Sequence, residues 1–146
     1  LEAAVNGLDE KRARLARMRD YVLEHIQKMP QVKVNGPLDG SKRLPNNVNA
    51  SFTAAEGESL LLMLDMRGVC ASSGSACASG SLDPSHVLLS IGLPHEIAHG
   101  SLRLTLSEEN TKEEMDYVAE TIRDVVARLR SMSPLYEDFM KNNSRR

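Results

Sequence analysis

The stretch Ser101-Leu102-Arg103-Leu104-Thr105-Leu106 alternates polar and apolar residues. This pattern predicts a β-strand, because successive side chains of a strand point to opposite faces of its sheet. The three leucines would face the core, and Arg103 would share the other face with Ser101 and Thr105. An arginine on a rigid strand suits two-pronged binding of a carboxylate, although a surface arginine on a half-exposed strand is the simpler interpretation.

A strong amphipathic helix is expected directly after this strand. Thr111 and Glu114 have the spacing of a capping box, and Pro134 follows the apolar stripe. Apolar residues recur every three or four positions, as one helix face requires, at Met115, Val118, Ile122, Val125, Leu129 and Met132.

The first part of the chain predicts another helix, which ends before Pro30. Its apolar face is expected to hold Leu8, Leu15, Met18, Val22 and Ile26. The remaining positions are rich in charge, and we expect a solvated face that includes Lys11, Arg12, Arg14, Arg19 and Glu24.

Shorter elements are expected between these two helices. Residues 32–34 and 48–52 alternate as strands, and 69–71 is a candidate brief strand. Residues 58–66 are apolar enough for a buried helix that Gly68 ends. A further helix should begin at Pro84, with Asp83 as its cap, and stop at Gly92 before a short segment over 94–100. We therefore predict an α/β fold, a short and mostly antiparallel sheet packed with helices, in a single domain over 1–146.

Composition excludes several classes of protein. The chain has 146 residues, of which 41% are hydrophobic, and this is typical of a globular domain rather than a disordered one. A net charge of −2 gives no basic field for nucleic acid. The longest apolar run, over 60–64, is far too short to cross a membrane. Two cysteines favour a reduced, cytoplasmic setting, and the start at Leu1 suggests a piece of a longer protein.

The segment from Ser72 to Gly80 contains only Ser, Gly, Ala and Cys. Such residues cannot pack a core, so we expect residues 72–81 to form an exposed, mobile loop that carries Cys77. A thiol in this setting is either a nucleophile or an incidental part of a linker. Cys70, just after the expected helix stop, is predicted to be a packed structural cysteine.

Other chemical signatures are weak. His95 and His99 have the spacing of helical metal ligands, but no third ligand lies nearby, so we expect no metal site. The cysteine pair lacks the Cys-x-x-Cys redox spacing. The serine-rich segment has neither a nucleophile elbow nor a phosphate-binding loop.

Taken together, these segments resemble a known family. The run over 68–88 resembles the active-cysteine segment of NifS/IscS-type cysteine desulfurases, in the class V aminotransferase family, and the nitrogen-fixation branch in particular. Further similarity follows over 98–106 and 114–118, and upstream over 43–49 and 51–52. The resemblance implies the small C-terminal domain of a fold of the aminotransferase type that depends on pyridoxal 5'-phosphate.

The resemblance also implies an activity. Such enzymes are homodimers that use pyridoxal 5'-phosphate to take sulfur from L-cysteine and leave L-alanine. Cys77 would be the catalytic nucleophile that becomes a persulfide, and Arg103 would bind the substrate carboxylate. The sulfur would then pass to an iron–sulfur cluster scaffold or another acceptor protein, in nitrogenase-specific or in general cluster assembly.

The cofactor lysine is missing from this pattern. None of the six lysines lies in the His-Lys segment that holds the cofactor in the family. We therefore expect no bound cofactor and no turnover in this chain alone, and a frayed tail over 141–146. Two alternatives stay open: a stand-alone sulfur carrier or docking module, and another domain of the class V aminotransferase type. The sequence assigns no role to Cys70, His99 or Asn47.

Overall fold

The computed structural model describes residues 5–73, 84–134 and 136. Its elements, in chain order, are α2 (Leu8–Gln27), β1 (Val32–Val34), the 3-10 helix η1 (Gly40–Lys42), β2 (Asn47–Phe52), α3 (Gly57–Asp65), α4 (His86–Ser90), α5 (His95–His99), β3 (Ser101–Thr105) and α6 (Lys112–Ser131). The predicted α/β class is confirmed, and so are the strands over 32–34, 48–52 and 101–106 to within a residue or so at their ends.

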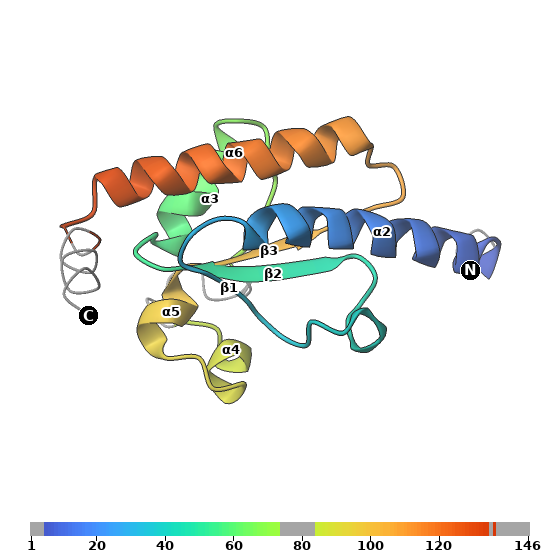
Figure 1. Ribbon diagram of the computed structural model, residues 1–146, viewed down its shortest axis with the longest axis horizontal. Coiled ribbons are helices and arrows are strands. Elements are labelled where there is room, and N and C mark those ends of the chain that lie inside the picture. Colours follow the sequence, from blue (N-terminus) through green and yellow to red (C-terminus); the bar gives the residue numbers. More distant parts are fainter. Residues whose placement is uncertain (1–4, 74–83, 135, 137–146) are drawn as a thin grey trace.

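The sheet has the order β1-β2-β3, and both strand pairs are antiparallel. Val48 pairs with Leu104, and Ala50 pairs with Leu102, so one face of the sheet is apolar. Helices α2 and α6 lie side by side over the sheet, and α3 packs against α6 (Figure 1). The core between these layers contains Val22, Ile26, Leu60, Leu64, Ile122 and Val125, all of which are buried.

Helix α6 begins as the sequence predicts. The Thr111 hydroxyl accepts from the Glu114 N–H, and the Glu114 carboxylate accepts from the Thr111 N–H. These two bonds satisfy N–H groups that have no partner within the helix. The predicted stripe is wrong at its last position, because the helix ends at Ser131 and the Met132 side chain is 60% exposed.

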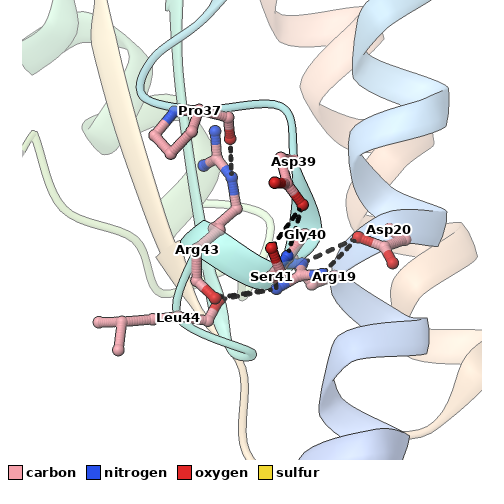
Figure 2. Close-up of polar contacts among 8 residues, drawn as sticks. All are labelled: Arg19, Asp20, Pro37, Asp39, Gly40, Ser41, Arg43 and Leu44. Carbon is pink, nitrogen blue, oxygen red and sulfur yellow. Dashed lines mark hydrogen bonds and ion pairs between the residues drawn. The ribbon is translucent and has the colours of Figure 1, made fainter.

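The predicted apolar and solvated faces of helix α2 are wrong at two residues, Leu8 and Arg19. Val22 and Ile26 are buried as expected, but Leu8, the first residue of α2, is 56% exposed. Arg19, expected on the solvated face, is only 2% exposed. Its Nη1 donates to three carbonyl oxygens of the loop before β2, those of Gly40, Arg43 and Leu44, at 3.1–3.4 Å (Figure 2).

Arg43 continues this anchoring towards the sheet. Its Nε donates to the Pro37 carbonyl at 3.0 Å, and its Nη2 donates to the Asn35 carbonyl at 2.7 Å (Figure 2 shows the first of these bonds). Burial lowers the pKa of Arg43, and the neighbouring charge of Arg19 lowers it further. The loop between β1 and β2 is therefore held by two arginines that donate to its backbone carbonyls, and Arg19 also forms an ion pair with the neighbouring Asp20 at 2.8 Å (Figure 2).

Two expected boundaries differ from the structure. Helix α4 begins at His86 with Ser85 at its cap, so Pro84 is not its first residue, and Asp83 lies outside the described residues. Residues 69–71 form no strand; instead Ser72 makes a single β-bridge with Arg103. Gly68 and Gly92 follow their helices with φ of 74° and 87°, which confirms both predicted helix stops. In the described part of the chain, no helix is long and apolar enough to span a membrane.

Candidate functional site

The candidate site is a row of polar side chains across the sheet, on the face opposite the core leucines. Arg103 in β3 lies directly across from Asn49 in β2 and forms a bridge with Ser72 on its other side. The Arg103 N–H donates to the Ser72 carbonyl at 2.6 Å, and the Ser72 N–H donates to the Arg103 carbonyl at 3.0 Å. Nη2 of Arg103 also donates to the Ser72 hydroxyl at 3.3 Å. The predicted orientation of Arg103, away from Leu102 and Leu104, is confirmed.

The row continues past β2 to Asn35. The Asn35 N–H donates to the Asn49 carbonyl at 2.9 Å, which places Asn35 beside Asn49. Its Nδ2 donates to Oδ1 of Asn49 at 2.7 Å and to the hydroxyl of Ser51 at 2.9 Å. Asn35 is only 4% exposed, so these bonds are made away from water and hold the amide firmly.

A second anchor fixes the backbone that leads towards Cys77. The buried Ser101 hydroxyl donates to the Ser73 carbonyl at 3.0 Å, one residue past the bridge with Arg103. Cys77 follows Ser73 by four residues and lies outside the described residues, as do residues 74–81 of the predicted mobile loop. The catalytic role of Cys77 therefore stays a prediction, but the segment that leads to it departs from the side of Arg103.

Other candidate residues lie apart from this row. Cys70 is exposed, which contradicts its predicted packing, because Val69 takes the buried position beside it. His95 and His99 are exposed, with ring centroids 6.4 Å apart, and no metal-binding cluster occurs among the described residues. Asn47 pairs with Thr105, and its buried Oδ1 has no partner among the described residues.

His99 lies close enough to Glu56 to affect the pKa of the Glu56 carboxyl group. Burial alone would raise the pKa of Glu56, but hydrogen bonds from the N–H groups of Glu58 and Ser59 outweigh it, and the pKa is lowered. His99 makes a further, smaller contribution in the same direction. Glu56 is the N-cap of α3, so this cluster holds the start of a helix.

Sequence reasoning found Arg103 but missed its neighbours Asn35, Asn49 and Ser72. A partial signal was present, since Asn47, Asn49 and Ser51 alternate along one strand and must share a face. The pairing of Asn49 with Arg103 depends on strand register, which that alternation does not supply.

Comparison with known proteins identifies the family. The model of the class-V aminotransferase family matches residues 3–118. The chain therefore belongs to the class-V aminotransferase family.

Two curated relatives show which members of this family the chain is similar to. The chain is 57% identical to the cysteine desulfurase IscS of Clostridium botulinum, over 97% of this chain and 36% of the relative. It is 49% identical to the IscS of Methanosarcina thermophila, over 92% of this chain and 33% of the relative. The chain thus spans about a third of the length of these curated relatives.

Solved structures agree with this assignment. A NifS-like protein superposes with a TM-score of 0.72 at 27% identity, over 86% of this chain and 30% of its own. A NifS-like protein from Rickettsia africae has the same fold, with a TM-score of 0.69 at 24% identity, over 82% of this chain and 30% of its own.

Proposed function

We propose that this chain is the C-terminal domain of a cysteine desulfurase that depends on pyridoxal 5'-phosphate. One observation carries the proposal: Ser72, at the start of the segment that holds Cys77, is bonded in both backbone directions to Arg103. Arg103, the residue proposed to bind substrate, is therefore adjacent to the start of the segment that contains the proposed nucleophile. The identity to the IscS relatives supports the same activity.

Each of the two residues has a chemical role in this proposal. The Arg103 guanidinium binds the carboxylate of L-cysteine through charge-assisted hydrogen bonds. The Cys77 thiolate forms a bond to the substrate sulfur while the carbon–sulfur bond breaks. The electron pair of that bond stays with the carbon, and a proton delivered to this carbon gives L-alanine. Cys77 is left as a persulfide, whose outer sulfur passes to an acceptor.

The cofactor would supply the electron sink for breaking the carbon–sulfur bond. The residues described here do not fit its covalent attachment. Strands β2 and β3, which carry Asn49 and Arg103, contain no lysine, and Lys33 of β1 is exposed and lies opposite Ser51, with β2 between it and β3. Lys11 in α2, Lys28 at the end of α2 and Lys112 in α6 make ion pairs with Glu108, Glu24 and Asp116. The apolar sides of these two helices cover the opposite face of the sheet. We propose that the cofactor is held by the part of the relatives' length that this chain does not span.

The proposed setting and partners follow from the same family. The parent enzyme would be a cytoplasmic homodimer that delivers sulfur to an iron–sulfur cluster scaffold or another acceptor protein. A second candidate is a sulfur carrier or docking module without its own cofactor chemistry, and the positions of the described lysines favour it.

A chimera tests the first candidate. This chain replaces the matching stretch of the Clostridium botulinum cysteine desulfurase, and alanine release from L-cysteine is measured. We expect turnover, which Cys77→Ala should abolish. Cys70→Ala is the matched control, a change of the same kind at the other cysteine of the chain, and it should leave turnover intact. An active Cys77→Ala chimera would contradict the proposed nucleophile.

A second experiment tests whether Cys77 of the chain alone accepts sulfur. It is incubated with a small-molecule persulfide, and its peptides are mapped for one added sulfur atom. Sulfur on Cys77, without alanine from L-cysteine, is expected in either case. A folded chimera that accepts sulfur on Cys77 but releases no alanine would favour the carrier module.

A further inference from the structure

We propose that Asn49 is a second donor to the substrate carboxylate, beside Arg103, and that Asn35 is the positioning residue that aims its amide. This inference rests on the proposed function, in which Arg103 binds the carboxylate of an amino acid. It adds two residues to the site, and it predicts two side chains that donate to the carboxylate rather than Arg103 alone.

Strand register places the two donors together. Asn49 and Arg103 are direct partners across β2 and β3, and both point away from the face that Val48 and Leu104 bury. Side chains directly opposite each other in antiparallel strands have Cβ atoms about 5 Å apart. A carboxylate can therefore accept from the guanidinium with one oxygen and from the amide with the other.

The hydrogen bond from Asn35 decides which end of the Asn49 amide faces Arg103. Asn35 lies on the β1 side of Asn49, and its Nδ2 holds the Oδ1 of Asn49 at 2.7 Å. The Nδ2 of Asn49 then lies on the β3 side, where Arg103 is. Within the described residues this Nδ2 donates to no acceptor, and two neighbouring donor groups suit an anion.

Asn35, which positions Asn49, is buried, whereas the two donors, Asn49 and Arg103, are partly exposed to solvent. Asn35 is 4% exposed and is held by Ser51 and by the guanidinium of Arg43, while Asn49 and Arg103 are only half-buried. Because the amide is already fixed, it loses little conformational entropy when a ligand binds. This arrangement therefore strengthens binding of the carboxylate.

The main test uses the chimera as an active enzyme. Asn49→Ala should raise the KM for L-cysteine roughly tenfold, as expected for one lost hydrogen bond to a charged group. Turnover number should change little, because the carboxylate contact is the same before and during reaction. The matched control is Asn47→Ala, the same residue type two positions along the same strand face, which should leave KM unchanged. An unchanged KM in Asn49→Ala would overturn the inference.

A second measurement does not depend on turnover. The chain labelled with ¹⁵N is titrated with acetate, against chloride at equal ionic strength, and the side-chain amide resonances are followed by NMR. We expect the Asn49 amide to shift saturably with acetate, and this response to be lost in Arg103→Gln and weakened in Asn35→Ala. If the Asn49 amide does not respond, the inference fails. If it responds but the chimera is inactive, the carboxylate site stands and the proposed function fails.

Discussion

The two faces of the sheet are built from alternate residues of the same strands, yet they differ in what holds them. On one face, Leu102 and Leu104 pair with Ala50 and Val48 beneath α2 and α6, and burial of apolar surface stabilises them. On the other face, Arg103 and its neighbours are joined by directed hydrogen bonds. The apolar face therefore contributes most to stability, and the polar face carries Arg103 and the other residues of the proposed site.

The largest expected effect comes from the apolar face. Leu104→Ala should lower the free energy of unfolding by about 2–5 kcal/mol, because it leaves a cavity under the helices. The adjacent Thr105 is exposed and points to the other face, so Thr105→Ala should change stability by less than about 0.5 kcal/mol. Chemical denaturation of both variants measures the difference, and equal losses would break the comparison between the faces.

A smaller effect on stability is expected at Arg19, which links α2 to the loop between β1 and β2. Arg19→Met keeps an apolar stem but removes the donor to the carbonyls of Gly40, Arg43 and Leu44, together with the ion pair to the exposed Asp20. Stability should fall by about 1–3 kcal/mol, the usual cost of unsatisfied buried groups.

The control for Arg19 is Arg17→Met, an exposed arginine of the same helix, for which the change should stay within about 0.5 kcal/mol. Denaturation curves of the two variants should therefore separate clearly. Overlapping curves would mean that the loop carbonyls of the Arg19 variant find water instead.

Arg19 also shows where sequence reasoning stops. Local patterns predicted the strands, the long helices and the capping box, because alternation, helical spacing and Thr111 with Glu114 act over a few residues. Arg19 looked like one charge among many. Its ion pair with the adjacent Asp20 is local, but the carbonyls that accept from its Nη1 belong to a loop more than twenty residues away. The pairing of Asn49 with Arg103 likewise depends on strands far apart in sequence.

A modest effect is expected where the polar face holds the segment that leads to Cys77. Ser101→Ala removes the hydroxyl that donates to the Ser73 carbonyl, and stability should fall by about 1 kcal/mol. Hydrogen exchange should also become faster at the amide of Ser72, which is bonded to Arg103. Ser107→Ala, at an exposed position after β3, is the control. Unchanged exchange in Ser101→Ala would show that the bridge alone anchors this segment.

The smallest effect concerns a surface cluster that joins the two helices over the apolar face. The Tyr21 hydroxyl donates to the Asp116 carboxylate, and Lys112 Nζ lies 2.9 Å from the same group. The Tyr21 hydrogen bond, and then that of Lys112, lowers the pKa of Asp116 below its ordinary value of 3.8. Its contribution to stability is therefore present above that value and is lost as the pH falls through the lowered pKa.

The stabilities of wild type and Asp116→Asn test this contribution. Wild type should be slightly more stable at about pH 7, and the difference should vanish by about pH 2. The effect should be small, because all three groups lie at the surface where water and salt screen them. Lys28→Gln, which breaks an exposed pair with Glu24 within α2 alone, is the comparison variant. A difference for Asp116→Asn that persists in acid would assign the effect to packing between α2 and α6 rather than to charge.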